Sequence, residues 1–565
     1  MAQIQDLPVE LLTAIFLYLR CLPSTYEREP TCKGISQVCE HWREVALNTP
    51  ELWTLIPLVS ARWTKLCIAR SSPAPIVVHA EWLRDYEHEA RRKTLQLVYP
   101  EVHRISSLRI SSMAYLINHR VTADGIQGEL HTTQILADLF TDSNAGAAVT
   151  LSDLFISFDD GAGQISEDPH RHTFGAGTSS VETLKHPADL PLAMFGASRL
   201  DALKAASFKA CRLPLSWSGT FLPTTLRSLT LVDASAWRNV DTLVAFFRLV
   251  PNLESLDVQR PGKWRTCPFS AIPSLAHPPR CAQLARLHTL RVYASFGHIL
   301  ALLTYLSLPV ITCIDISVRG KARLIPDAEP LLQLGTTAIR DHFAPAAADG
   351  LAHGHVGVEN GRITAPCSRT LTRTLQVSHV DVGTSRSSVN IHLGNFEKRD
   401  NTPYHRDAYA LFLLQPMFSG AESMTCLDFL PPGVWPLFHH FTTRSLCLGP
   451  ASYDCFMEAI ADAPSEAPLF PSLRRLIIAN GSLDRYDVTR RTRMRTHEIM
   501  YIQRLRDIGQ RIIQMAQRLA QYDEFESLVL AGSAVQSVAE ETLSAITNIL
   551  GEERVELQAE SPSAS

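Results

Sequence analysis

The chain has 565 residues, of which 45% are hydrophobic and 19% are charged, and its net charge is −4. This length exceeds what one hydrophobic core supports, and it predicts about two to four domains or one extended repeat array. The slightly acidic balance argues against a protein whose whole surface is basic for binding nucleic acid. The twelve cysteines include no Cys-x-x-Cys pair, and the first residues lack the basic and apolar regions of a secretory signal. We therefore expect reduced thiols in a protein of the cytoplasm or nucleus, with no nucleic acid as partner.

The N-terminal residues predict a short amphipathic helix. Apolar residues recur three or four positions apart from Leu7 to Leu19, which places them on one helix face. Pro8 suits the first turn of such a helix, and Glu10 lies near the positive end of its dipole.

The same spacing over residues 35–46 predicts a second short helix. Pro50 ends this helix, because proline cannot continue a helix interior. Leu52 and Trp53 then begin another apolar anchor. Together the two helices predict a small helical bundle at the start of a larger fold.

The order of residue types in this bundle resembles the F-box motif. The matching residues are Leu7-Pro8-x-Glu10-Leu11-Leu12-x-x-Ile15-Phe16-x-x-Leu19, then Val38-Cys39-x-x-Trp42-Arg43, then Pro50-x-Leu52-Trp53. Trp63 and the segment Arg70-Ser71-Ser72-Pro73 also resemble the variety of F-box protein that is abundant in mushroom-forming fungi. Residues 21–34 form a longer linker than many F-boxes have, so the spacing of the two helices departs from the motif.

The resemblance implies a substrate-recognition subunit of a cullin-based ubiquitin ligase of the SCF type. The N-terminal helices would dock on a Skp-family adaptor, and through it on a cullin, while the rest of the chain holds an unknown client protein. Ubiquitin transfer would take place in other subunits, so the resemblance implies no catalytic residue and no cofactor. The adaptor contacts that carry over from the motif are Leu7, Pro8, Leu11, Leu12, Ile15, Phe16, Val38 and Trp42. Some of these residues must instead hold the bundle together, and the sequence does not separate the two roles.

Beyond the bundle, residues 57–100 form a bridge with a predicted strand within residues 73–81. A short phrase then recurs, in which two apolar residues three positions apart are followed by a third two positions later. Its nine copies begin at Ile105, Leu151, Leu226, Leu253, Leu287, Ile311, Met424, Leu473 and Phe525. Some copies follow a helical run that proline ends, and this order of helix, break and short strand is typical of leucine-rich repeats.

We predict an α/β fold in which the small helical F-box is followed by an irregular leucine-rich-repeat-like solenoid with insertions. The second apolar residues of the central copies, Leu229, Leu256, Leu290 and Ile314, are 27, 34 and 24 positions apart. These intervals loosely bracket the usual period of about 20–29 residues. One strand and one helix cannot bury their own apolar face, so stacked copies would supply the core. The alternative is an unrelated α/β domain.

The predicted organisation has six parts, and a loop without periodicity over residues 159–189 interrupts the third of them. The parts are an F-box over 1–56, a bridge over 57–100, a repeat-like region over 101–318, an insertion with some β structure over 319–408, a second repeat-like region over 409–550 and a disordered tail over 551–565. Residues 292–314 carry no formal charge, but polar residues and Pro309 interrupt them, so we expect no membrane span.

Motifs for catalysis and for metal binding are weak. Gly161-Ala-Gly163 and Gly175-Ala-Gly177 lack the third glycine of a dinucleotide-binding loop. His170-Arg-His172 and His353-Gly-His355 lie in stretches that are poor in other metal ligands. We therefore expect no metal site, and a hydrolase or transferase would need a catalytic constellation that these motifs do not provide.

The repeat phrase also predicts a client-binding face. The residue between its last two apolar positions points to the outer face of the sheet, because side chains alternate along a strand. In the central copies these residues are Thr230, Asp257, Arg291 and Asp315. Their mixed charges predict a polar contact of complementary charge.

A second client-binding candidate is the segment over residues 485–518, which contains nine arginines. Arg504, Arg511 and Arg518 fall seven positions apart and form a basic stripe beside an apolar one. The stripe is either a solvated helix face or a site for an acidic or phosphorylated partner, since guanidinium groups suit carboxylate and phosphate. For the whole protein, the alternative to a ligase subunit is a repeat scaffold that binds the adaptor or other proteins without degradation of any client.

Overall fold

The structure is a computed structural model that describes most of the chain. The described residues are 7–20, 31–58, 60–82, 88–113, 149–159, 188–190, 200–213, 223–260, 269–309, 313–318, 329–348, 355–359, 362–366, 388–392, 410, 413–426, 430, 432–463, 468–478, 510–531 and 540–558. The predicted loop over 159–189 and the long linker over 21–34 therefore lie mostly outside the described residues.

The chain forms two compact units. Unit 1 comprises residues 1–270 and 282–286, and unit 2 comprises residues 271–281 and 287–565. The elements of unit 1 are α1 (Val9–Arg20), α2 (Thr31–Ile35), α3 (Glu40–Leu47), η3 (Pro50–Trp53), β1 (Leu55–Ile56), α4 (Ala61–Ser71), β2 (Ile76–Trp82), α5 (His88–Val98), η5 (Tyr99–Arg104), β3 (Ile105–Met113), β4 (Asp153–Asp159), β5 (Ala188–Asp189), β6 (Ala205–Lys209), β7 (Cys211–Arg212), β8 (Ser228–Val232), α8 (Val240–Leu249), β9 (Ser255–Gln259) and β10 (Ala282–Gln283).

Unit 2 combines strands with longer helices. Its elements are β11 (Thr289–Ala294), α9 (Phe296–Tyr305), β12 (Leu306–Ser307), β13 (Cys313–Val318), α10 (Glu329–Ala348), β14 (His355–Glu359), β15 (Arg362–Pro366), β16 (Ser388–His392), α12 (Pro416–Ser419), β17 (Ser423–Cys426), η10 (Pro432–His440), β18 (Ser445–Leu448), α13 (Pro450–Asp462), β19 (Arg475–Ile478), β20 (Ser527–Ala531), α16 (Glu540–Leu550), η12 (Glu552–Arg554) and β21 (Val555–Gln558). Residues 510–519 are also helical.

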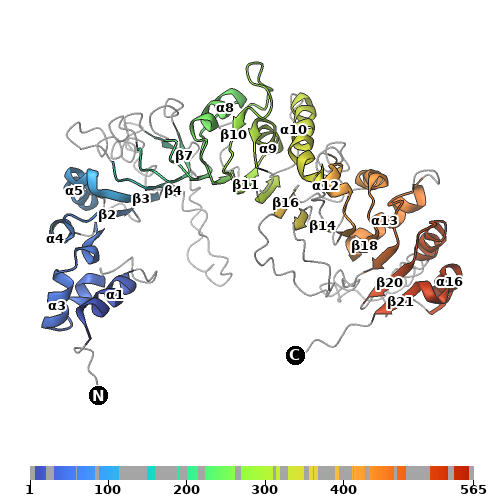
Figure 1. The fold of residues 1–565 in the computed structure, drawn as a ribbon, viewed down its shortest axis with the longest axis horizontal. Coiled ribbons are helices and arrows are strands. Elements are labelled where there is room, and N and C mark those ends of the chain that lie inside the picture. Colours follow the sequence, from blue (N-terminus) through green and yellow to red (C-terminus); the bar gives the residue numbers. More distant parts are fainter. Residues whose placement is uncertain are drawn as a thin grey trace, which may run out of the picture. The chain divides into compact units, whose positions relative to one another are not determined.

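A parallel sheet runs through unit 1 in the order β1-β2-β3-β4-β6-β8-β9. Figure 1 shows α8 on one side of this sheet, and the helices α1 and α3 beyond its first strands, near α4. One row of buried side chains crosses all of these strands in register. The row consists of Ile56, Val78, Leu108, Leu154, Ala206, Leu229 and Leu256. Since a buried aliphatic side chain contributes about 1.5–3 kcal/mol, this row supplies a core that no single strand has.

The sheet of unit 2 has the order β11-β13-β16-β15-β14-β17-β18-β19-β20-β21. All neighbours are parallel except β15, which is antiparallel to both β14 and β16. Within its described residues, the predicted insertion thus contributes a helix and three strands, and those strands lie between β13 and β17 in the sheet.

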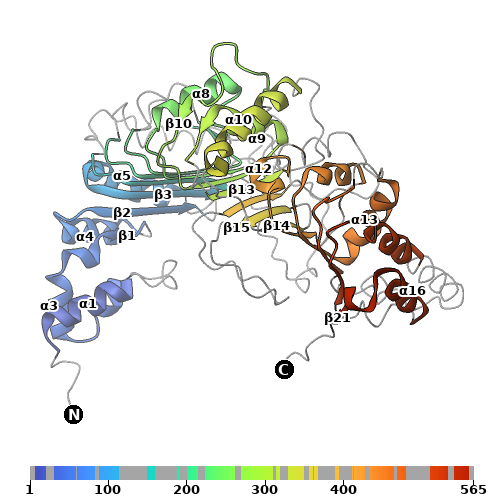
Figure 2. The same cartoon turned by 45° about the vertical axis from the view of Figure 1, so that its right-hand side comes forward.

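Helices α9 and α10 of unit 2 pack side by side, as both views show (Figures 1 and 2). Gly335 of α10 permits their close approach. A Cβ atom at this position would lie 3.1 Å from Thr304 Oγ1 and 3.2 Å from Leu300 Cδ2, both in α9. These distances are tight for a carbon atom, so the missing side chain lets the helices meet.

Eight of the nine repeat phrases coincide with strands, and the second apolar residue of each is buried. Ile311, the first residue of one of these copies, lies outside the described residues. The strand predicted within residues 73–81 is also present, as β2. The copy placed at Met424 is wrong by three residues, because Met424 pairs with Leu446 and therefore occupies the second position, not the first. The first position belongs to Ala421, which is buried like the leucines elsewhere. An alanine in place of leucine hid the true start of this copy.

Two strands carry the phrase although the sequence did not identify them. In β6 the phrase starts at Leu203 with Ala206 at its centre, and in β18 it starts at Thr443 with Leu446. Residues 551–565 were predicted to be a disordered tail, which is wrong for residues 552–558. They form η12 and β21, and β21 pairs in parallel with β20 because Val555 and Leu557 continue the alternation of the sheet.

Candidate protein-interaction surface

Helix α1 presents two apolar stripes and buries only one of them. The carbonyl of Pro8 accepts hydrogen bonds from the N–H groups of Leu11 (3.0 Å) and Leu12 (3.1 Å), which starts the helix. Leu12 and Phe16, four positions apart, are fully buried. Leu11 and Ile15, also four apart, remain 53% and 40% exposed. Each pair lies along one helix face, and the two faces are neighbours.

The predicted second helix is wrong as a single element, because a turn divides it into α2 and α3. Cys39 has an extended backbone (φ −154°), and its Sγ accepts a hydrogen bond from the N–H of Trp42 (3.4 Å), so it caps the start of α3. Nε of Arg43 donates to the carbonyl of Ser36 (3.0 Å) and holds the turn. Val38 consequently lies in the turn rather than on a helix face, and it is 60% exposed.

Aromatic side chains join the helices of the bundle. The rings of Phe16 and Trp42 lie 4.9 Å apart between their centroids. Trp53 is fully buried, and its indole N–H donates to the carbonyl of Ala46 (2.8 Å). Leu52 is buried as well, so the anchor predicted after Pro50 is confirmed.

Helix α4 is built onto this bundle. The ring of Trp63 lies 6.0 Å from that of Trp53, and the guanidinium carbon of Arg70 lies 4.3 Å above the Trp53 ring centroid. Cys67 of α4 donates a hydrogen bond that holds the pKa of the Cys32 thiol below its ordinary value. Both thiols are buried. The bundle therefore continues without a break into α4.

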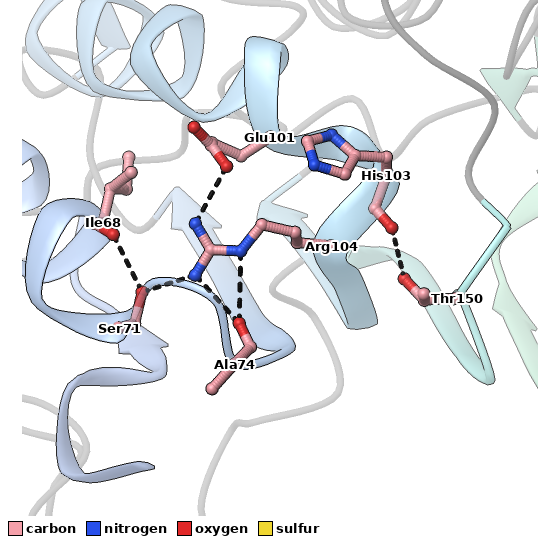
Figure 3. A network of polar contacts seen from close by, with 7 residues as sticks. All are labelled: Ile68, Ser71, Ala74, Glu101, His103, Arg104 and Thr150. Carbon is pink, nitrogen blue, oxygen red and sulfur yellow. Dashed lines mark hydrogen bonds and ion pairs between the residues drawn. The ribbon is translucent and has the colours of Figure 1, made fainter. Parts of the chain in front are cut away.

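The turn after α4 is fixed against the sheet by a guanidinium group (Figure 3). Nε and Nη2 of Arg104 donate to the carbonyl of Ala74 (3.2 and 2.8 Å), and Nη2 also donates to Oγ of Ser71 (3.0 Å). Glu101 pairs with Nη1 at 2.9 Å, while the Ser71 hydroxyl donates to the carbonyl of Ile68 (3.0 Å). Since β1 also pairs with β2, the bundle, α4 and the first strands form one connected body.

The structure divides the predicted adaptor contacts into three groups. Leu12 and Phe16 belong to the core, and Leu7 and Trp42 are half-buried. The exposed residues are Pro8, Leu11, Ile15 and Val38. Among the predicted contacts, this third group is the most exposed and therefore the best placed to contact another protein.

Three further apolar residues of the bundle are exposed, and the sequence analysis missed them. They are Val9, Tyr18 and Leu47. Tyr18 is 69% exposed and follows Leu11 by seven positions and Ile15 by three, so helical spacing alone identifies it as part of the same face. Leu11, Ile15 and Tyr18 are called the α1 stripe below.

The predicted client-binding residues lie on neighbouring strands within each unit. Thr230 of β8 pairs in register with Asp257 of β9, and Arg291 of β11 pairs in register with Asp315 of β13. Arg291 is exposed, and the other three are half-buried. The phrase thus brings each pair together on one face of its sheet.

Two arginines of the predicted basic stripe contact α13 of the same chain. Nη1 of Arg511 lies 3.3 Å from Oε1 of Glu458, and Nη2 of Arg518 donates to the carbonyl of Ala461 (3.3 Å). Arg504 lies outside the described residues. At least part of the stripe therefore holds helical residues 510–519 against their neighbour.

Two other kinds of site are not found in the described part of the chain. No group of three or more His, Cys, Asp or Glu side chains there could hold a metal ion. No helix there is long and apolar enough to cross a bilayer. What the N-terminal bundle does offer is exposed apolar surface, which is suited to contact with another protein.

Residues 4–56 match the sequence model of the F-box-like family. The matched range starts ahead of α1 and ends with β1, so it contains the bundle, its aromatic core and the α1 stripe. A comparison of the chain with curated proteins finds no match. The N-terminal part of this protein, residues 4–56, is therefore an F-box-like domain.

Proposed function

We propose that this chain is the substrate-recognition subunit of a cullin-based ubiquitin ligase of the SCF type. The observation that carries the proposal is the α1 stripe, an exposed apolar surface on a domain that matches the F-box-like family. In this role the chain docks on a Skp-family adaptor and holds a client near the ubiquitin-transferring subunits, so it contributes proximity and no bond-making residue.

The α1 stripe is suited to be the adaptor contact because it is rigidly supported. Leu12 and Phe16 anchor the neighbouring face of the same helix in the core, so the helix that carries the stripe is already ordered before it binds. Full burial of a leucine or isoleucine side chain contributes about 1.5–3 kcal/mol. Val38 extends the exposed apolar surface in the turn that follows α2.

We further propose that the region after the F-box is an irregular leucine-rich-repeat solenoid. Its support is the phrase, which recurs in register on successive parallel strands in both units. We also assign the chain to the variety of F-box protein found in mushroom-forming fungi. This resemblance rests on Trp63 and the segment Arg70-Ser71-Ser72-Pro73. Two of these residues, Trp63 and Arg70, pack on Trp53, which gives them a structural role in extending the F-box into α4.

The client site proposed from the sequence is the outer face of the sheet strands. Thr230, Asp257, Arg291 and Asp315 are its first candidates, and Arg511 and Arg518 are weaker ones because they already contact α13. A polar face of mixed charge favours selectivity among partners over raw affinity.

The second candidate function is a scaffold that binds the adaptor without degradation of a client. The same exposed surface supports this scaffold function. The ligase subunit and the scaffold differ in which proteins are purified together with the chain. Purification of the full chain from its own cells with both adaptor and cullin supports the ligase subunit. Adaptor without cullin supports the scaffold, and neither protein would contradict both.

The adaptor contact is tested by two acidic substitutions in the stripe, L11D and I15D, introduced together. Both side chains are exposed, so we expect the thermal unfolding midpoint to stay near that of the wild type. Capture of a purified Skp-family adaptor should fall by more than about 100-fold, because loss of one hot-spot side chain costs about 2 kcal/mol or more.

The matched control is V149D, which places the same charge on an exposed apolar residue of unit 1 away from the bundle. It should bind the adaptor as the wild type does. Undiminished adaptor capture by the L11D/I15D chain would show that the stripe is not the contact.

A further inference from the structure

The outer face of the unit 1 sheet carries one arginine that is held on an aromatic ring. Arg109 of β3 pairs in register with Phe155 of β4, and both point away from the buried row, since Leu108, Ile110, Leu154 and Ile156 alternate with them. The guanidinium carbon of Arg109 lies 4.3 Å from the Phe155 ring centroid. This distance is typical of a cation–π contact.

The arginine has no carboxylate partner among the described residues. The side chain of Arg109 is exposed. The nearest acidic position on this face of β4 is Asp153, and Oδ2 of Asp153 accepts a hydrogen bond from the Ser152 hydroxyl. Further along the sheet, Asp257 accepts from Nε2 of Gln259 (3.1 Å). Within the part of the chain that the structure describes, no carboxylate therefore neutralises the charge of Arg109.

Several described neighbours of the pair on β3 and β6 have small side chains. On β6, the residues in register with Asp153 and Phe155 are Ala205 and Ser207, which are small. On β3, the same face carries Ser107 and Ser111 on either side of Arg109. The half-exposed Phe155 ring and the exposed Arg109 are thus larger than these four neighbours.

Charged and titratable residues lie near Arg109 on the neighbouring strands, and one of them is Glu81 of β2, which pairs in register with Ser111 on the same face. His79 of β2 lies in register beside Arg109, and burial together with the charge of Arg109 lowers the pKa of His79. A neutral His79 donates or accepts a hydrogen bond at neutral pH without adding positive charge. Lys209 of β6 lies on the same face of the sheet.

We propose that Arg109, stacked on Phe155, is the anchor for a carboxylate side chain in an acidic segment of the client protein. A guanidinium held by an aromatic face is already ordered, so less side-chain freedom is lost on binding, and its planar edge matches a carboxylate. The exposed part of the Phe155 ring accepts an apolar side chain next to that carboxylate. This site deepens the proposed function, because it names the chemistry of the client, and it lies on strands β3 and β4 outside the residues singled out from the sequence.

The test uses the full chain, both alone and after incubation with its adaptor, and two labelled peptides. One peptide alternates glutamate with leucine, and the other replaces every glutamate by glutamine. The wild type should prefer the acidic peptide, and R109Q should weaken that binding by about tenfold to 100-fold, as expected for a charged hydrogen bond. R109K should recover part of the affinity, and F155L should lower it, because leucine keeps an apolar side chain but removes the ring face.

The matched control is R248Q, which removes an exposed arginine from helix α8 of the same unit. It should leave peptide binding unchanged. An equal loss in R248Q and R109Q, equal binding of the glutamine peptide, or binding of a phosphopeptide or a single-stranded RNA in place of the acidic peptide would each overturn the anchor.

Adaptor capture is measured on the same preparations, so the two proposals fail separately. Loss of adaptor binding in the wild type, with acidic-peptide binding that still depends on Arg109, would defeat the proposed function and leave the anchor standing. Normal adaptor capture, with peptide binding that is the same in the wild type and in R109Q, would defeat the anchor and leave the proposed function standing.

Discussion

Leu11 and Leu12 are adjacent in α1, yet the first contacts solvent and the second lies in the core. Apolar spacing marks both equally, because a helix that is apolar over a wide arc satisfies the periodicity with either of two neighbouring faces. The choice between them depends on α3, whose Trp42 packs on Phe16. That contact depends on the tertiary structure. The sequence therefore predicted the set of apolar residues, but it did not predict which of them are buried and which are exposed.

The contrast between buried and exposed residues of α1 predicts a large loss of stability for one substitution and a small one for its neighbour. Phe16→Ala removes a fully buried ring and should lower the free energy of unfolding of the F-box region by about 3–5 kcal/mol. Ile15→Ala trims an exposed side chain and should change that free energy by less than about 0.5 kcal/mol while it weakens adaptor binding. Urea unfolding followed by tryptophan fluorescence compares the two. Equal destabilisation would mean that the assignment of the stripe is wrong.

His342 makes the stability of unit 2 depend on pH. It is buried in α10, and burial, assisted by the charge of Arg280, lowers its pKa from 6.5 to about 4, although a backbone hydrogen bond to Leu308 opposes the shift. At pH values between these two pKa values, His342 binds a proton in the unfolded chain but not in the folded chain. Protonation of His342 therefore favours unfolding. The stability that the neutral side chain contributes is fully present above the pKa of His342 in the unfolded chain, and it is lost as the pH falls toward about 4.

We expect unit 2 to lose up to about 3 kcal/mol between pH 7 and pH 4 through this histidine, since one pKa unit corresponds to about 1.4 kcal/mol. His342→Gln keeps a neutral polar group and should remove this part of the pH dependence. His288→Gln, at an exposed position in the same unit, is the control and should leave it in place. The measurement is urea unfolding at a series of pH values, and an identical slope in wild type and His342→Gln would refute the assignment.

At the scale of elements, strands were easier to predict than helices. The phrase identified strands because its two leading apolar residues are both buried. The first lies just before the strand and the second lies within it, as Leu226 and Leu229 do at β8. The phrase failed where alanine or threonine takes the first or central place, as in β6, β17 and β18. The division between α2 and α3 was missed for a different reason. Cys39 is an unusual helix cap, and a thiol does not signal a helix start as serine or aspartate does.

The alternation along β8 predicts unequal effects for two adjacent residues. Leu229→Ala leaves a cavity in the buried row between Ala206 and Leu256 and should cost about 2–5 kcal/mol. Thr230→Ala lies on the outer face and should cost less than about 1 kcal/mol, the span of strand propensities. Differential scanning calorimetry of both variants distinguishes the cases. A larger loss for Thr230→Ala would place the core on the opposite face of the sheet.

At the scale of the molecule, the F-box is packed against the rest of unit 1 and is not a separate module joined to it by a loop. Trp53 is covered by Trp63 and Arg70, and β1, the last element of the F-box match, is the first strand of the unit 1 sheet. The sequence suggested a boundary at residue 56 because the motif ends there. The packing places no boundary at that residue, so a client held on the first strands of unit 1 would be positioned directly by the domain that docks on the adaptor.

If each strand depends mainly on its neighbours, a defect should remain local, as in repeat proteins. Leu154→Ala should accelerate amide hydrogen exchange in β3, β4 and β6 and leave β18, β19 and β20 at wild-type rates. Leu476→Ala should do the opposite, because Leu476 pairs with Leu446 and Leu528 in unit 2. Exchange followed by mass spectrometry on the full chain reads both regions at once. Equal acceleration in both units by either variant would show a single cooperative core and would remove the physical basis for assigning this sheet to a repeat solenoid.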